Sequence, residues 1–262
     1  MYLQYYRVMN RIQKRNAIRD KLSSGKVSIG SWMQLPNASV AEIMGQAGYD
    51  WVAVDLEHGS VDISQLPDLF RALELGDTLP LVRLAQDHPK DCKLALDAGA
   101  GGVIIPMVES ASQLRSISEA CCWPPAGTRG VGFSRGNLFG KHFETYSEEA
   151  QAPLVIAMIE NIKALDEMDD MLQVEGLDAI LIGPYDLSAS MNLTGKFETA
   201  EFKDAMSRII SLCNKHKIPC GVHVVQPDQV MLQQRITEGY RFLAYSIDSV
   251  FLNVSVKNPF VS

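Results

Sequence analysis

Several features that mark whole classes of protein are missing from this sequence. Its 262 residues contain no run of about 18 consecutive apolar residues, so a membrane-spanning helix is not expected. Lys and Arg number 24 against 31 Asp and Glu, and this formal net charge of -7 lacks the basic footprint of nucleic-acid binding. The first 15 residues contain no continuous apolar targeting segment. These absences predict a cytoplasmic protein without membrane or nucleic-acid partners.

Cysteine and phosphate-binding glycine motifs are also poorly represented. The five cysteines are odd in number, and their spacing matches no zinc or redox motif, so free thiols in a reducing compartment are expected. No G-x-G-x-x-G follows the first apolar run. This counts against a doubly wound open sheet, which is the main structural alternative to the fold derived next.

A repeated alternation of short apolar runs and amphipathic stretches predicts the fold. Several helix-like stretches end at a glycine, as at Gly48, Gly99 and Gly239, where a C-terminal helix cap belongs. Eight strands alternating with helices over 262 residues indicate one (β/α)8 TIM-barrel domain, 1–262, with 1–15 as an N-terminal helical extension. The expected strands are Val27–Met33, Trp51–Asp55, Leu79–Leu84, Gly102–Met107, Leu154–Glu160, Ala179–Gly183, Pro219–Val224 and Arg241–Tyr245.

The second and third expected strands end in ionisable residues. In a barrel of this type the chemistry lies at the C-terminal ends of the strands. Asp55, Glu57 and His58 follow one another there, and an Asp beside a His can orient the ring as an acid or base. Arg83 interrupts the next apolar run and needs an anionic partner, either a substrate or a buried acid such as Glu57.

Two further carboxylates follow the fifth and sixth strands. Glu160 ends one, and Asp186 follows the turn Gly183-Pro184-Tyr185 after the other. Asp186 alone is as well explained by helix capping. Together the two carboxylates predict a site for a hard divalent cation that keeps open positions for a substrate.

Two other segments leave their role open. Asp97 stands near the end of an expected helix and either faces solvent or serves a site. The glycine-rich segment Pro124–Asn137 has the composition of a binding loop, and its backbone amides from Gly130 to Ser134 can hold a carboxylate. The remaining histidines, including His223 at the end of the seventh strand, are assigned to structure or surface.

The motifs at these positions resemble the HpcH/HpaI aldolase family, the class II pyruvate aldolases of the phosphoenolpyruvate/pyruvate barrel superfamily. The resemblance extends from Gly30 to about Asn253. Its marks are GSWMQL, VAVDLEHG, LVRL, LDAGAGGVIIPMVES, PPAGTRGVG, MIEN and GPYDLSASM. It implies a carbon–carbon lyase that cleaves or forms a 4-hydroxy-2-oxo acid, giving pyruvate and an aldehyde through a metal-bound enolate.

The resemblance also implies roles for individual residues. His58, oriented by Asp55, would be the acid/base, and Arg83 would stabilise the enolate. The direct ligands of Mg²⁺, Mn²⁺ or Co²⁺ would be Glu160 and Asp186. The carboxylates of Glu57 and Asp97 would hold metal-bound waters. The substrate would contact Ser134, Gly183 and Pro184.

One departure and two alternatives remain. Many family aldolases have Gln two residues before the metal-binding Glu, but this chain has Met158, so the aldehyde partner is left open. A citrate-lyase-β-like acyl-CoA lyase on the same barrel is the second interpretation, and a catalytically idle binding barrel is the third. The resemblance further implies a homo-oligomer, hexamer or trimer, with the apolar C-terminal helix packed on a neighbouring subunit.

Overall fold

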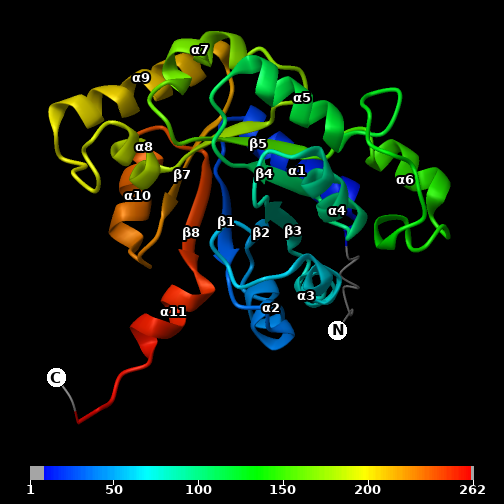
Figure 1. Cartoon of the computed structure of the whole chain (residues 1–262). Helices are drawn as coiled ribbons and strands as arrows, with labels where there is room; N and C mark the ends of the chain where they lie inside the picture. Colours follow the sequence, from blue (N-terminus) through cyan, green and yellow to red (C-terminus); the bar gives the residue numbers. More distant parts are fainter. Residues whose placement is uncertain (1–8, 261–262) are drawn as a thin grey trace.

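The computed structural model describes residues 9–260, and it contains the expected closed barrel (Figure 1). Neighbouring strands pair in parallel around the ring, and β1 closes it against β8. Each expected strand is present, with ends displaced by at most two residues. The strands are β1 (Ser28–Met33), β2 (Trp51–Asp55), β3 (Leu79–Arg83), β4 (Gly102–Ile105), β5 (Leu154–Ile159), β6 (Ala179–Ile182), β7 (Cys220–Val224) and β8 (Phe242–Ile247).

Helices surround the barrel, and those before Gly48, Gly99 and Gly239 end within three residues of these glycines, as expected. Asn37 and Asp228 cap their helices with side-chain acceptors, and Pro89 occupies the first turn of its helix. The helices are α1 (Arg11–Ser23), α2 (Ala38–Gly45), α3 (Leu66–Glu74), α4 (Pro89–Asp97), α5 (Ala111–Cys121), α6 (Phe143–Glu149), α7 (Ala164–Met171), α8 (Pro184–Ser190), α9 (Ala200–His216), α10 (Gln229–Thr237) and α11 (Asp248–Ser255). Short 3₁₀ turns lie at Ile63–Gln65 and Arg135–Asn137.

Two apolar layers follow from the alternation of side chains along each strand. One layer fills the space between strands and helices, and the other fills the barrel itself. Ile18 and Leu22 of α1 belong to the inner layer, together with Leu79 and Leu154 at the starts of their strands. Helix α1 therefore closes the N-terminal end of the barrel. The expected extension 1–15 overlaps α1 only from Arg11, and residues 1–8 lie outside the described part.

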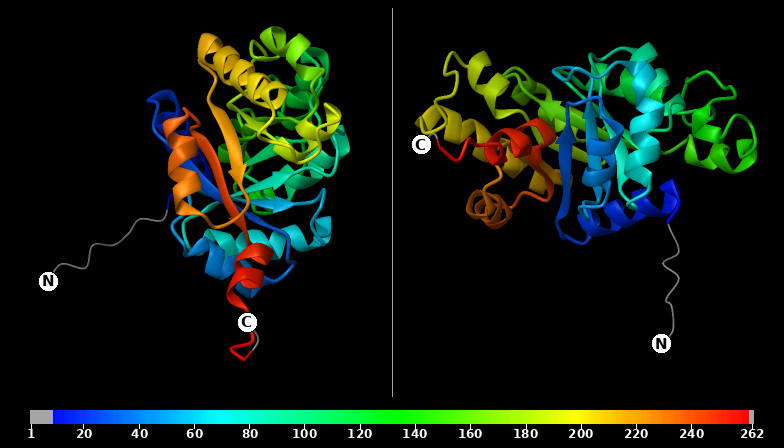
Figure 2. Two further views of the ribbon diagram at one scale, coloured as in Figure 1. Left: turned by 90° about the vertical axis from the view of Figure 1, so that its left-hand side faces the viewer. Right: turned by 90° about the horizontal axis from the view of Figure 1, so that it is seen from below.

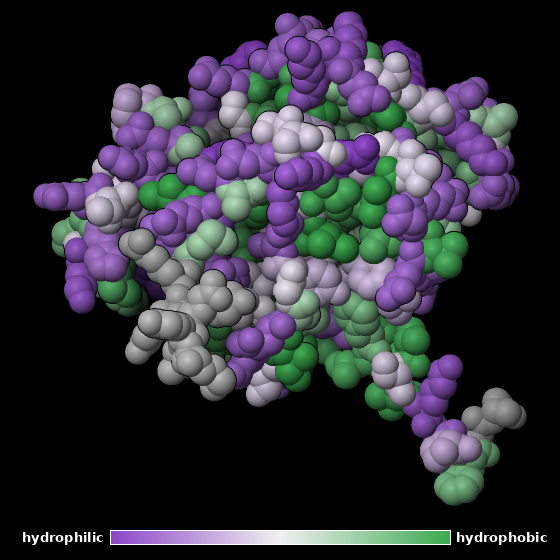
Figure 3. Space-filling model, turned by 180° about the vertical axis from the view of Figure 1, so that it is seen from behind, coloured by the Kyte–Doolittle hydropathy of each residue, from purple (hydrophilic) through white to green (hydrophobic). Residues whose placement is uncertain are grey.

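The last helix, α11, leaves the barrel instead of covering it (Figures 1 and 2). Its first residue, Asp248, is buried, and the carboxylate accepts hydrogen bonds from the backbone N–H groups of Gln34 and Leu35, each at 2.9 Å. Beyond this anchor the segment exposes apolar side chains, including Val256 at 75% and Phe260 at 94%. The space-filling view from behind shows it projecting from the body (Figure 3). No helix within residues 9–260 has both the length and the apolar character needed to cross a membrane.

Candidate active site

An ion pair joins the ends of β2 and β3. Asp55 and Arg83 are partners in the parallel register, so their side chains leave the sheet side by side. Nε of Arg83 lies 2.8 Å from Oδ1 of Asp55, and Nη2 lies 2.6 Å from Oδ2. Burial alone would raise the pKa of Asp55, but the hydrogen bonds and charge of Arg83 outweigh it and lower this pKa. The guanidinium also lies 5.2 Å from the centre of the Trp32 ring, so its orientation is fixed.

The expected contact between Asp55 and the ring of His58 is not found in the described structure. Oδ1 of Asp55 instead accepts the backbone N–H groups of Glu57 at 3.1 Å and His58 at 3.2 Å, and Oδ2 accepts from the amide of Gln34 at 3.0 Å. With Arg83 these contacts occupy both carboxylate oxygens. Asp55 therefore orients Arg83 and shapes the loop that carries His58, whose side chain is exposed.

Glu57 adds a second carboxylate beside the same arginine. Its Oε2 atom lies 3.0 Å from Nη1 of Arg83 without hydrogen-bond geometry, and it is one of the enclosed polar atoms that have no hydrogen-bond partner. Burial raises the pKa of Glu57, although the charge of Arg83 opposes this. A buried carboxylate oxygen without a full partner is costly, so this position favours an additional cation or donor.

Glu160 lies immediately after β5 and is 2% exposed. Its Oε2 atom accepts the backbone N–H of Met107 at 2.9 Å. Burial raises the pKa of Glu160 to about 7, and the negative charges of Glu57 and Asp186 add to this rise. A Cβ atom on Gly183 would lie 2.5 Å from Oε1 of Glu160, so the glycine is needed for the close approach of β6.

Asp186 lies in the first turn of the short helix α8. Gly183 is the N-cap residue and Pro184 the first helical residue, so Asp186 is not the cap itself. Its side chain is exposed, and its charge acts on both Glu57 and Glu160. The ends of β2, β3, β5 and β6 thus bring Asp55, Glu57 and Glu160 close to Arg83, and Asp186 close to the two glutamates.

Asp97 and Ser134 are not brought to this cluster. Asp97 is the last residue of α4, which runs opposite to the strands and so ends at the far end of the barrel. Its Oδ1 atom lies 3.4 Å from Nη1 of Arg129. Ser134 precedes Arg135, which binds the Ala98 carbonyl oxygen at 3.0 Å. Both residues therefore belong to the opposite end of this barrel, where neither meets Glu160 in the same chain.

The residues whose place in the site was not predicted are Trp32, Gln34 and His223. Trp32 follows Gly30 by two positions on β1, so alternation directs its side chain into the barrel. His223 stacks on Trp32, and Gln34 binds Asp55. Strand alternation was the available signal for Trp32 and His223. Gln34 lies beyond the end of β1, where no periodicity applies.

Comparison with known proteins shows the family of this chain. The family model described as HpcH/HpaI aldolase/citrate lyase matches residues 28–253. The chain belongs to the HpcH/HpaI aldolase/citrate lyase family. A hydroxypyruvate/pyruvate aldolase of Roseobacter denitrificans is 33% identical, over 90% of this chain and 93% of that protein. A 4-hydroxy-2-oxovalerate aldolase of Novosphingobium aromaticivorans is 35% identical, over 89% of each chain.

Solved structures agree with this HpcH/HpaI membership. A family protein from Burkholderia cenocepacia has a TM-score of 0.86 and 28% identity, covering 92% of this chain and 96% of that one. A citrate lyase β-subunit from M. tuberculosis, complexed with oxaloacetate and magnesium, has a TM-score of 0.56 and 16% identity, over 88% of this chain and 95% of that one, and shows the fold alone. The relatives named above at 33% and 35% identity are aldolases, which are carbon–carbon lyases, and the citrate lyase is a more distant relative.

Proposed function

We propose that this protein is a divalent-metal-dependent aldolase that cleaves or forms a 4-hydroxy-2-oxo acid, with pyruvate and an aldehyde as the other reactants. The observation that carries the proposal is the excess of negative charge at the C-terminal ends of the strands. Asp55, Glu57 and Glu160 surround the guanidinium of Arg83, and Asp186 adds a fourth negative charge beside the two glutamates. Burial together with like charge raises the pKa of Glu160 to about 7. Such a cluster favours a bound cation.

The donor set fits a hard divalent metal such as Mg²⁺, Mn²⁺ or Co²⁺. Glu160 and Asp186 supply oxygen atoms from adjacent strand ends, and Glu57 offers an oxygen without a hydrogen-bond partner. No group of three or more His, Cys, Asp or Glu side chains in residues 9–260 is arranged around a metal position. Two protein carboxylates suit a cation that retains water and accepts substrate oxygens. When bound there, the metal would act as a Lewis acid toward the 2-oxo acid.

The protein side chains supply the remaining chemistry. Arg83, held by Asp55 and Trp32, presents a fixed positive charge to the enolate that forms when the C3–C4 bond breaks. His58 is exposed at the mouth and takes the proton of the C4 hydroxyl group in the cleavage direction. The turn at Gly183 and Pro184 contacts the substrate carboxylate. Electrons of the broken bond pass to the pyruvate enolate, which is protonated at C3, and the aldehyde leaves.

The exposed C-terminal segment supports a homo-oligomer. Val256 and Phe260 are apolar and largely exposed, and only Asp248 of α11 is buried in its own chain. Packing of α11 on a neighbouring copy, within a trimer or hexamer, would remove this apolar surface from water.

The test is pyruvate release from 4-hydroxy-2-oxo acids of several chain lengths, coupled to lactate dehydrogenase. The chelator-treated protein is assayed with and without added Mg²⁺, Mn²⁺ or Co²⁺. Metal-dependent pyruvate formation supports the aldolase. Full activity after chelation contradicts the metal role, and cleavage of an acyl-coenzyme A thioester without pyruvate release contradicts the aldolase in favour of the acyl-CoA lyase.

A further inference from the structure

Strand β7 carries a histidine that the proposed reaction does not use. His223 pairs in register with Ala244 of β8, which belongs to the layer inside the barrel. The adjacent Val222 belongs instead to the layer between strands and helices. His223 therefore points inward, and as the penultimate residue of β7 it lies near the mouth.

The ring of His223 is fixed beside the Arg83 cluster. It stacks on the indole of Trp32 with ring centres 5.1 Å apart and planes 30° apart. The same indole lies beneath the guanidinium of Arg83, at 5.2 Å. One aromatic side chain thus contacts both the arginine that faces the enolate and this histidine.

The tautomer of His223 follows from its hydrogen bond. Nε2 lies 3.0 Å from the carbonyl oxygen of Ser246, and because a carbonyl oxygen only accepts, Nε2 carries the hydrogen. Ser246 has a φ of 57° at an irregularity in the β1–β8 pairing, and the Ser31 hydroxyl donates to the preceding carbonyl oxygen of Tyr245 at 2.8 Å. Burial lowers the pKa of His223 to about 4, so the ring is neutral and Nδ1 is an acceptor.

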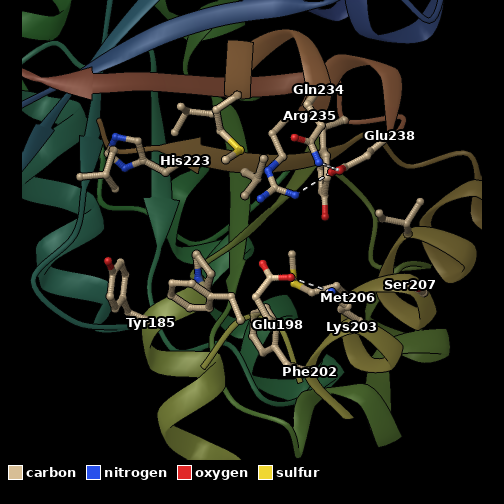
Figure 4. A pocket seen from close by; sticks show the side chains of 18 of the residues that line it. Tyr185, Glu198, Phe202, Lys203, Met206, Ser207, His223, Gln234, Arg235 and Glu238 are labelled. Atoms are coloured by element: carbon tan, nitrogen blue, oxygen red, sulfur yellow. Dashed lines mark hydrogen bonds and ion pairs between the residues drawn. The ribbon is translucent and has the colours of Figure 1, made fainter. Parts of the chain in front are cut away.

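The other ring nitrogen, Nδ1, remains available near the mouth. Nδ1 has no hydrogen-bond partner among residues 9–260, and it is not one of their enclosed polar atoms without a partner. A cavity of about 1090 Å³ lies between α9 and α10 over β7, and His223, Pro184 and Tyr185 are among the residues that line it (Figure 4). Most of its lining comes from those two helices and from Val222, so this cavity lies on the helix side of β7, whereas the ring of His223 points into the barrel.

We infer that His223 determines specificity: its Nδ1 accepts a hydrogen bond from a hydroxyl group on the aldehyde half of the substrate, and the enzyme therefore favours 2-hydroxyaldehydes over alkyl aldehydes of equal length. The inference rests on the proposed aldolase function. A bound alkyl aldehyde leaves this half-buried acceptor without a hydrogen bond, which costs binding free energy. A hydroxyl group on the aldehyde donates that hydrogen bond and avoids the cost. The far side of the substrate is thereby recognised by a neutral group, separate from the charged groups that bind the 2-oxo acid.

The test compares the condensation of pyruvate with 2-hydroxypropanal and with propanal. The wild-type protein should favour 2-hydroxypropanal in kcat/KM by about tenfold. His223→Phe keeps a ring against Trp32 but removes Nδ1, and it should lower kcat/KM for 2-hydroxypropanal about tenfold while that for propanal stays within about twofold. His142→Phe, at an exposed histidine, is the matched control and should leave the ratio unchanged.

The outcomes separate the inference from the function on which it rests. Absence of product with both aldehydes overturns the aldolase function, and the inference with it. Product formation with an unchanged ratio in His223→Phe overturns the role of His223 alone. If that variant does not fold, the wild-type protein still decides the matter, because a preference for propanal overturns the inference without any variant.

Discussion

The two ends of the barrel each bury an arginine beside an aspartate, yet they differ in charge balance. At the mouth, Arg83 makes two short contacts with Asp55 and has two further carboxylates close by, Glu57 and Glu160. At the opposite end, Arg129 lies 3.4 Å from Asp97 and 5.7 Å from each of the Trp123 and Tyr146 rings.

The arginines near Arg129 are bound mainly by backbone carbonyl oxygens. Nη1 of Arg15 donates to those of Glu149 and Ala152, both at 2.9 Å, and Arg11 donates to that of Gly99 and also forms an ion pair with the Glu149 carboxylate at 2.7 Å. A buried arginine therefore has a structural role where carbonyl oxygens accept its hydrogen bonds. Where carboxylates outnumber the arginine, it indicates a reaction site.

The largest expected effect on turnover distinguishes a carboxylate at the mouth from one at the opposite end of the barrel. Glu160→Ala should lower the metal-dependent rate by roughly 10³-fold or more, because it removes a proposed direct ligand and the Lewis acid with it. Glu149→Ala, at the opposite end, should keep its kcat while losing stability. Steady-state pyruvate formation with a metal titration measures both. Equal losses of kcat in the two variants would contradict the distinction between the ends.

The arginines give the next comparison. Arg83→Lys retains a charge but cannot form the two-point contact with Asp55, so kcat should fall by roughly 10²-fold. Arg129→Lys should leave kcat near the wild-type value and lower the free energy of unfolding by about 2 kcal/mol. Turnover and urea unfolding are measured on both proteins. A normal kcat for Arg83→Lys would remove this arginine from the reaction.

The raised pKa of Glu160 predicts a pH-dependent stability in the absence of metal. The folded carboxyl binds a proton up to about pH 7, but the unfolded one releases it near 4.5, so the folded state binds more protons between these values. Stability of the chelator-treated protein should therefore fall as pH rises from 4.5 through 7, by at most about 3 kcal/mol.

Glu160→Gln isolates the contribution of this single group. The variant lacks the titration, so in chelator it should be more stable than the wild-type protein at pH 8 and similar to it at pH 5. Urea unfolding at both pH values, with and without Mn²⁺, provides the measurement. Added metal should restore the stability of the wild-type protein at pH 8, and it should not do so for Glu160→Gln. A pH-independent difference between the two proteins would argue against the raised pKa.

The smallest effect on turnover is expected from the C-terminal segment. Replacing Val256 and Phe260 by Asp should lower the molar mass in solution, since two charges would enter an apolar contact between copies. Val230→Asp, at an 80% exposed position of α10, is the control. Light scattering after gel filtration gives the mass. An unchanged mass in the tail variant would mean that α11 does not hold the copies together.

The sequence predicted the strands well because their signal is local. Continuous apolar runs that follow a glycine-ended helix define β2 or β4 without knowledge of any partner strand. The carboxylates at strand ends could be placed for the same reason. The contact of Asp55 could not, because it depends on the register that sets Asp55 opposite Arg83, and register is a property of two strands.

Residues on helices and long loops were harder to place. Asp97 stands 14 positions after Arg83 in the sequence, but α4 reverses the chain direction and carries it to the other end of the barrel. Ser134 lies in a loop whose path is decided by Arg135 and its contacts with Glu74 and Ala98. Met158 is a simpler case, since alternation places it inside the barrel, where it is 5% exposed.

The filled interior of the barrel has a kinetic consequence. Side chains occupy it down to Ile18 and Leu22 of α1, so only the mouth is left for reactants and products. In the proposed reaction the 2-oxo acid would lie deeper, against Glu160 and Arg83, and the aldehyde would lie between it and solvent. Release would then be ordered, with the aldehyde leaving first and pyruvate second. In the synthetic direction pyruvate would bind first, and aldehyde added in excess would block the departure of pyruvate.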